Sequence, residues 1–237
     1  SRSTMMHGSA SVVVAREVVR KGTELAAQAL EAAVPDIEFD RGRYRVKGTD
    51  LSISLTDLVA KHVGVSPHPL DSLADIPALR AFPGGAHVAE VEIDPETGTV
   101  DVQSYVAVDD CGRVINHVLL EGQLHGGIMQ GFGQVFAEHC IYDPVSAQLL
   151  TGTFTDYTMP RADSLGEARL YDRSVPSPTN ALGAKGVGEA GTTGAVPTLA
   201  HAVLDALHPL GIERLDFPYT PAKLWQAINS AKGGRVA

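Results

Sequence analysis

Cysteines are scarce in this sequence, and long apolar runs are absent from it. Its 237 residues contain only Cys111 and Cys140, too few for a disulfide framework or for the four thiolates that usually hold an iron–sulfur cluster. So low a number favours the reducing cytoplasm as the compartment. No stretch reaches the roughly 18 apolar residues that a membrane helix needs. These absences argue against a disulfide-rich secreted domain, a membrane protein and a resident iron–sulfur cluster.

Excess positive charge is missing as well. The formal net charge is −9, and no run rich in lysine or arginine offsets it, so we expect no attraction to nucleic acid or to an anionic membrane. Hydrophobic residues make up 44% and charged residues 20%, as in ordinary globular proteins. The first residues include neither an initiator methionine nor an apolar signal core, which leads us to expect a fragment.

The spacing of apolar residues predicts an α+β fold with mixed sheets and β-hairpins packed against helices. Hairpins are expected around the turns at 40–42 and 95–98. Ser54 and Thr220 are expected to cap helices. The proline-rich segment 64–83 is interpreted as a linker or a covering loop, and the chain is expected to contain two subdomains, about 1–80 and 81–237. The expected helices cover about 9–33, 55–63, 115–137, 192–207 and 220–229, and the expected strands about 37–39, 44–46, 87–93, 99–108, 138–151 (a pair), 167–172 and 212–217.

A glycine-rich loop with a single acid is the most informative segment. The stretch from Gly186 to Gly191 matches a GxGxxG fingerprint, but the Pro- and Ser-rich residues 176–180 before it do not resemble the buried strand that such a fingerprint follows. Lys185 is followed by glycine, which excludes a P-loop. Glu189 therefore stands in a loop whose backbone can approach a ligand closely, just before a helix. Shielding from water would suit it as a general base, although by spacing alone a surface Glu that caps the helix is the commoner arrangement.

The helix expected over 115–137 contains five glycines, each of which costs about 1 kcal/mol relative to alanine. Close approach of another backbone or of a ligand would explain them. Gln123, Gln130 and Gln134 lie near one face of this helix, and amides suit oxo groups and pterin edges. The alternative is a tightly packed helix whose amides cap neighbouring loops. Before the first helix, Ser1-Arg2-Ser3-Thr4 could bind phosphate or form a frayed terminus.

Together these segments resemble the large, molybdenum-cofactor-binding subunit of the xanthine dehydrogenase, aldehyde oxidase and aerobic carbon monoxide dehydrogenase family. The resemblance covers nearly the whole chain and implies the second half of the cofactor-binding domain, at the C-terminal end of that subunit. It rests on four ordered motifs: Val108-Asp109-Asp110-Cys111-Gly112-Arg113-Val114-Ile115-Asn116, Gly122-Gln123-x-x-Gly126-Gly127-x-x-Gln130-Gly131-x-Gly133, Lys185-Gly186-Val187-Gly188-Glu189, and Leu215-Asp216-Phe217-Pro218-Tyr219-Thr220-Pro221.

The resemblance also implies roles for individual residues. Glu189 matches the catalytic base of the family, and Gln123 matches a glutamine near the oxo group of molybdenum. Ser1, Arg2, Ser3 and Thr4 match a segment that binds the pterin. The pterin dithiolene holds the metal, so no protein metal ligand is expected. The remaining cofactor-binding residues, which would shape the loop beside the metal, are Lys185, Gly186, Val187 and Gly188.

The implied enzyme is a molybdenum hydroxylase that oxidises an aldehyde or N-heterocycle with oxygen from water. Its cofactor would be molybdopterin, plain or as the cytosine dinucleotide. The N-terminal remainder of the large subunit would complete the site, and 2Fe-2S and FAD groups on partner chains or segments would receive the electrons. Two alternatives stay open. A nicotinamide-dependent dehydrogenase predicts a parallel sheet with a strand directly before Gly186, and a catalytically incomplete assembly or binding module would keep the fold alone.

Overall fold

The computed structural model describes residues 2–77 and 79–233, and it divides into two compact units. One unit consists of Arg2–Arg80 together with Pro178–Leu182, and the other of Ala81–Ser177 together with the described part of Gly183–Ala237. Each unit has a hydrophobic core of its own. No helix in residues 2–77 and 79–233 is long and apolar enough to cross a membrane.

The unit that begins at Arg2 packs one long helix against a small sheet. Tyr44 is fully buried in its core, where it lies against Gly22 of α1. A Cβ at Gly22 would come within 1.9 Å of the Tyr44 hydroxyl, so only glycine leaves room for the ring there. The elements are α1 (Arg2–Ala29), a 3-10 turn η1 (Val34–Asp36), β1 (Ile37–Asp40), β2 (Arg43–Val46), β3 (Ser52–Ser54) and α2 (Leu55–Lys61), with the strands in the antiparallel order β1-β2-β3.

The boundaries of α1 differ from the sequence-based prediction of 9–33. The helix already begins at Arg2, because Gly8 does not interrupt it: a Cβ at Gly8 would lie 2.6 Å from Leu182, so this glycine permits a close contact inside the helix. The helix ends at Ala29, and Glu31 follows with a left-handed backbone (φ 52°). The predicted cap of α2 is confirmed, since the Ser54 side chain accepts a hydrogen bond from the Asp57 N–H.

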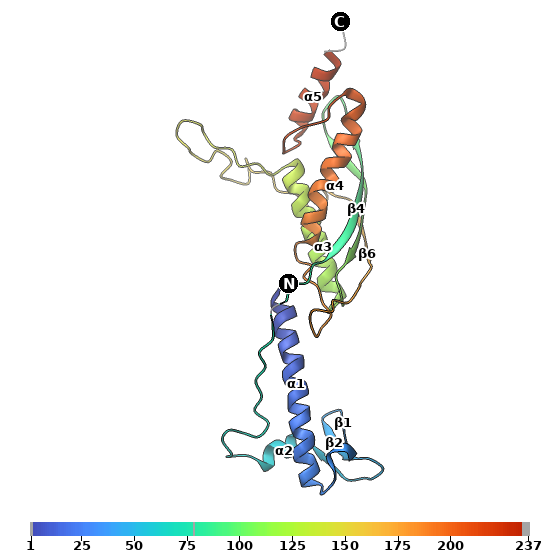
Figure 1. The fold of residues 1–237 in the computed structure, drawn as a ribbon. Helices are drawn as coiled ribbons and strands as arrows, with labels where there is room; N and C mark the ends of the chain where they lie inside the picture. Colours follow the sequence, from blue (N-terminus) through green and yellow to red (C-terminus); the bar gives the residue numbers. More distant parts are fainter. Residues whose placement is uncertain (1, 78, 234–237) are drawn as a thin grey trace. The chain divides into compact units, whose positions relative to one another are not determined.

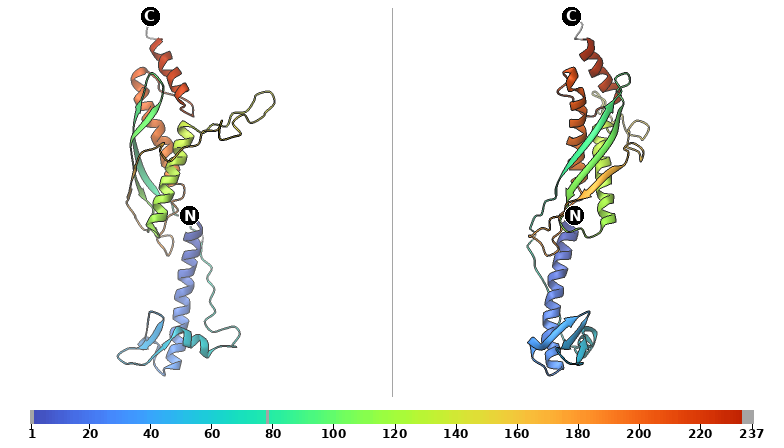
Figure 2. Two further views of the ribbon diagram at one scale, coloured as in Figure 1. Left: turned by 180° about the vertical axis from the view of Figure 1, so that it is seen from behind. Right: turned by 90° about the vertical axis from the view of Figure 1, so that its right-hand side faces the viewer.

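The second unit contains a three-stranded sheet with helices on one face (Figures 1 and 2). Strands β4 and β5 form a long antiparallel hairpin, and β6 pairs with β5 in parallel. The core lies between this sheet and α3 and α4, and it includes Tyr105, Ile128, Leu199 and Val203. The predicted α+β class with hairpins against helices is thus confirmed. The elements are β4 (Gly84–Ile93), β5 (Val100–Asp110), α3 (His117–Phe136), β6 (Ala168–Asp172), α4 (Ala190–Leu207), a 3-10 turn η2 (His208–Leu210) and α5 (Pro221–Gly233).

Glycines set the distance between α3 and α4. A Cβ at Gly191 would lie 2.5 Å from the Leu124 carbonyl, and one at Gly127 would lie 2.9 Å from the Thr192 nitrogen. A Cβ at Gly131 would lie 2.6 Å from Cβ of Ala195. The two helices therefore touch through main-chain atoms, which explains why α3 tolerates residues that weaken a helix.

The predicted strands at 212–217 and at 138–151 are absent from the structure. Residues 212–217 form no strand, because no described strand edge lies beside them; instead Ile212 and Leu215 pack partly buried against the core. Residues 138–151 were predicted as a strand pair, but they contain only one bridge, between Tyr142 and Leu149. This stretch belongs to a long arm that projects from the end of α3 (Figure 1).

Candidate active site at the start of helix α4

Main-chain and side-chain hydrogen bonds join the loop before α4 to Asp110, the last residue of β5, and to the residues that follow it. The Arg113 and Ser177 N–H groups both donate to the Gly183 carbonyl, at 2.8 and 2.9 Å. The Lys185 N–H donates to the Cys111 carbonyl at 3.1 Å, and Ala184 pairs with the residue after Cys111 in a short antiparallel bridge. The loop is therefore held against residues 111–113, which directly follow β5.

Lys185 also forms an ion pair with Asp110 of β5. Its ammonium lies 2.5 Å from a carboxylate oxygen of Asp110, and the two side chains are only 15% and 23% exposed. The N–H groups of Gly112 and Val175 donate to the other oxygen of the same carboxylate, both at 2.9 Å. The hydrogen bond from Lys185 is the main cause that lowers the pKa of Asp110 to about 2. Sequence reasoning quoted Asp110 only as part of a motif and gave it no role.

Glu189 occupies the N-cap position of α4 without capping it. Its backbone is helical (φ −105°, ψ −4°), and its side chain makes no capping hydrogen bond. The residue is exposed in this chain, so the expected shielding from water is not provided by these residues. The interpretation of Glu189 as a helix-capping residue predicts a bond that the structure lacks. The carboxylate is available to a ligand at the positive end of the helix dipole.

Gln123 lies on the exposed side of α3, close to the start of α4. Its neighbour Leu124 is buried, and the Leu124 carbonyl is the atom that approaches Gly191, two residues after Glu189. The structure therefore brings together the two chain segments that carry Gln123 and Glu189, which are 66 positions apart in the sequence.

Two glycines of α3 have a different surrounding from those that face α4. A Cβ at Gly122 or Gly126 would meet nothing within 4 Å. Both residues are exposed, and they flank Gln123 and the exposed His125 along the helix. Helix packing within this chain thus explains Gly127 and Gly131 but not these two. Their bare backbone leaves open space on the exposed part of α3 near Gln123.

The N-terminal candidates belong to the other compact unit. Arg2, Ser3 and Thr4 are exposed and lie in the first turn of α1 rather than before it. Ser1 lies outside the described residues. The structure thus groups Gln123, Lys185–Gly188 and Glu189 in one unit, and it leaves Arg2–Thr4 as a separate set.

A buried polar cluster on β4 and β5 lies beside Gly194, one turn further along α4 than Glu189. Sequence reasoning missed this cluster. His87 of β4 places Nε2 3.2 Å from a carboxylate oxygen of Asp109 and Nδ1 2.7 Å from the Tyr105 hydroxyl. The side chains of His87 and Asp109 are only 3% and 5% exposed. Burial, and then the charge of Asp109, raises the pKa of Tyr105. The sequence offered one signal, an Asp among the apolar inward positions of β5.

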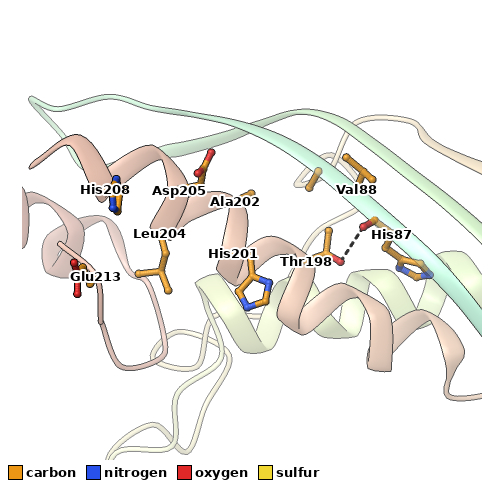
Figure 3. Close-up of a pocket in the computed structure, with 10 residues that line it drawn as sticks. His87, Val88, Thr198, His201, Ala202, Leu204, Asp205, His208 and Glu213 are labelled. Carbon is orange, nitrogen blue, oxygen red and sulfur yellow. Dashed lines mark hydrogen bonds between the residues drawn. The ribbon is translucent and has the colours of Figure 1, made fainter. Parts of the chain in front are cut away.

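A shallow groove runs between β4 and the α4 residues from Thr198 to Asp205. Figure 3 shows the Thr198 hydroxyl pointing to the His87 carbonyl, which accepts its hydrogen bond at 3.4 Å. None of the predicted site residues lines this groove. In residues 2–77 and 79–233 no group of three or more His, Cys, Asp or Glu side chains could hold a metal ion.

The residues around Glu189 fit a cofactor that carries its own metal ligands. They offer an amide at Gln123, a carboxylate at Glu189 and a glycine-rich main chain at 186–188, with open space over Gly122 and Gly126. Amide and main-chain groups donate and accept hydrogen bonds, as a pterin requires. The nicotinamide alternative is not supported, because the loop before Gly186 contains no strand and only a single bridge residue, Ala184.

Comparisons with known proteins identify the family of the chain. The family of molybdopterin cofactor-binding domains matches residues 1–166. The carbon monoxide dehydrogenase large chain of Hydrogenophaga pseudoflava is 32% identical over 234 residues, covering 96% of this chain and 29% of that protein. Subunit gamma of the 6-hydroxypseudooxynicotine dehydrogenase complex of Paenarthrobacter nicotinovorans is 33% identical and covers 98% of this chain and 30% of that protein.

The fold leads to the same group of proteins. A crystal structure of the Cu,Mo-CO dehydrogenase in its carbon monoxide reduced state superposes with a TM-score of 0.84 at 32% identity, over 99% of this chain and 30% of that one. The chain thus spans less than a third of the length of the relatives it matches. Because the family match covers well over half of the chain and the fold agrees, this chain belongs to the family of molybdopterin cofactor-binding domains.

Proposed function

We propose that this chain forms the C-terminal part of the large subunit of a multi-subunit molybdenum hydroxylase, and that Glu189 is its catalytic base. One observation carries the proposal: Glu189 is exposed at the start of α4, makes no capping hydrogen bond, and stands beside the α3 segment that carries Gln123. A carboxylate in this position can accept a proton from a bound group instead of stabilising its own helix.

The reaction replaces a C–H bond of an aldehyde or N-heterocycle by C–OH, with oxygen from water, and releases two protons and two electrons. When bound, molybdopterin would supply the molybdenum centre that takes up the two electrons, and iron–sulfur and flavin groups of partner segments would remove them. Glu189 accepts one of the two protons at a carboxylate oxygen. The amide of Gln123 and the main chain of Gly186–Gly188 hold the cofactor edge by hydrogen bonds.

The remaining parts of the site come from outside this pair of helices. We propose that Ser1, Arg2, Ser3 and Thr4 bind the pterin side of the cofactor. The groups of Arg2, Ser3 and Thr4 lie in the first turn of α1, where hydroxyl and guanidinium groups suit an anionic ligand. The cytosine dinucleotide is the proposed form of the cofactor, and release of CMP on acid hydrolysis of the enzyme would identify it. A cytoplasmic enzyme agrees with the two free cysteines, Cys111 and Cys140.

The test replaces the base while keeping its size. Glu189→Gln in the assembled enzyme retains one acceptor oxygen but cannot take up the proton at neutral pH. Single-turnover reduction of the enzyme by benzaldehyde, quinoline and hypoxanthine identifies the substrate class with the wild type. With the active probe, the Glu189→Gln rate should fall by at least about 10²-fold, the low end for loss of a general base, at unchanged molybdenum content.

The matched control is Glu90→Gln, the same change at an exposed position of β4. It should leave the rate within about twofold of the wild type, since most exposed substitutions have small effects. A Glu189→Gln enzyme that is fully loaded and reduced at the wild-type rate rejects the base assignment. Loss of reduction with every probe in the loaded wild type instead favours an assembly or binding module.

A further inference from the structure

The segment that carries Glu189 has no support from the Glu189 side chain itself. It runs from the loop at Ala184 into the first turn of α4, and the N-cap side chain makes no capping hydrogen bond. The position of a general base nevertheless has to be held closely, because a misplacement of about 1 Å can cost about 10²-fold in rate. Contacts on either side of Glu189 must therefore fix this segment.

The contact on the N-terminal side is the Lys185–Asp110 pair. Lys185 precedes Glu189 by four positions; its ammonium binds Asp110, the last residue of β5, and its main-chain N–H donates to the carbonyl of the next residue, Cys111. Asp110 is itself oriented, because Gly112 and Val175 donate to its second oxygen. A charged pair with every oxygen engaged and little exposed surface holds one geometry better than an exposed pair does.

On the C-terminal side, Gly191 and Thr192 contact α3, and a further contact begins at Asp109, the residue next to Asp110. Successive side chains of a strand point to opposite faces, so Asp109 faces the helices while Asp110 faces the loop. Asp109 binds the His87 ring, and a Cβ at Gly194 would lie 2.4 Å from that ring. Gly194 follows Glu189 by five positions. The His87 carbonyl also accepts from Thr198, one turn later (Figure 3).

From these contacts we infer that Asp109 and Asp110 are positioning residues for Glu189: two adjacent carboxylates of β5 brace the segment 185–194 at both of its ends. The inference rests on the proposed function, because it assigns a purpose to the placement of Glu189. Asp110 acts through Lys185, and Asp109 acts through His87 and the first turn of α4. Neither carboxylate needs to touch the cofactor or the substrate.

The experiment uses the assembled enzyme with Asp110→Asn, Lys185→Gln and the double variant. Each single change should lower the single-turnover rate at least about tenfold at saturating substrate, with less than about twofold change in substrate affinity. The double variant should be no slower than the slower single variant, because both remove the same contact. Lys185→Arg should restore most of the rate. The control Asp101→Asn makes the same change on the same strand, where Asp101 accepts a hydrogen bond from Gln103, and should leave the rate unchanged.

A second readout does not depend on turnover. Amide hydrogen exchange in a peptide covering 185–194 should become at least about tenfold faster in Asp110→Asn and in Asp109→Asn, while exchange in α3 stays unchanged. If Asp109→Asn fails to assemble, His87→Gln tests the same contact. Unchanged exchange in 185–194 overturns the brace, whatever the activity shows.

The variants are repeated in the Glu189→Gln enzyme so that the two proposals can be separated. If Asp110 acts through Glu189, Asp110→Asn should cause no further loss of rate there, while exchange in 185–194 should still rise. An equal further loss means that Asp110 acts elsewhere, which overturns the brace and leaves the base assignment intact. A wild-type rate in the fully loaded Glu189→Gln enzyme overturns the base assignment, and with it the positioning role.

Discussion

At the scale of single residues, Gln123 is an exposed amide whose neighbour, Leu124, is buried. Gln123→Ala removes the amide that we propose binds the cofactor edge, and it should keep the helix, because alanine favours a helix at least as strongly as glutamine does. We expect turnover of the assembled enzyme to fall about 10²–10³-fold, as when one polar transition-state contact is lost. Steady-state kinetics with molybdenum analysis and a melting curve measure the effect.

The control for that change is Gln134→Ala, on the same face of α3 and also exposed. It should alter turnover less than about twofold, because it lies three turns away from Gln123. Equal effects of the two changes, or normal kinetics of Gln123→Ala at full cofactor loading, would contradict the role of Gln123.

At the scale of elements, adjacent glycines of α3 should respond in opposite directions. Gly126→Ala should stabilise this chain by about 0.4–1 kcal/mol, because alanine restricts the unfolded chain and its methyl group meets open space. Gly127→Ala should destabilise it by about 1–3 kcal/mol, because its methyl group would press on Gly191 and Thr192. Denaturant unfolding of the two variants compares their free energies of unfolding, and stabilisation by both changes would disprove the proposed main-chain contact.

The sequence predicted elements well where the local pattern determined them. The hairpin of β4 and β5, the cap at Ser54 and the helices α3 and α4 all follow from spacing, turn residues and capping residues. The strand expected at 212–217 failed because a strand needs a neighbouring edge, which a local pattern does not reveal. The start of α1 failed because Gly8 serves a contact with Leu182, far away in the sequence.

The sequence allowed us to propose the residues of the candidate site, but not the contacts that hold them in place. The glycine-rich segments singled out Glu189 and Gln123 as candidates, and the resemblance to a family supplied their expected roles. Their proximity follows from the contact between Gly127 and Gly191, which only the structure shows. The His87–Asp109 contact joins two strands through buried side chains, and a lone histidine in a strand pattern carries no sign of such a partner.

At the scale of the whole molecule, this chain by itself should fold but bind molybdopterin poorly. Each unit has its own core, whereas Glu189 and Gln123 are exposed and the chain spans about 30% of its relatives. The exposed apolar side chains Val118, Val145 and Phe154, at 78%, 95% and 84% exposure, should also promote self-association. Circular dichroism, pterin fluorescence after oxidation and sedimentation measure the three properties.

The complete enzyme, purified in the same way, is the reference for that comparison. It should contain molybdopterin at close to one equivalent, while the chain by itself should contain almost none. Tightly bound molybdopterin in the chain without any partner would show that these residues suffice for the site, and the proposed need for the rest of the subunit would then be wrong.

The contact between α3 and α4 has a consequence for how such enzymes diverge. Main-chain atoms at Gly127 and Gly191, rather than side chains, set the separation of the two helices. Exchanges among the larger apolar residues of the core can shift the sheet or fill space without moving these atoms apart. Related chains that keep these two glycines should therefore keep the separation between the α3 segment that carries Gln123 and the start of α4 that carries Glu189.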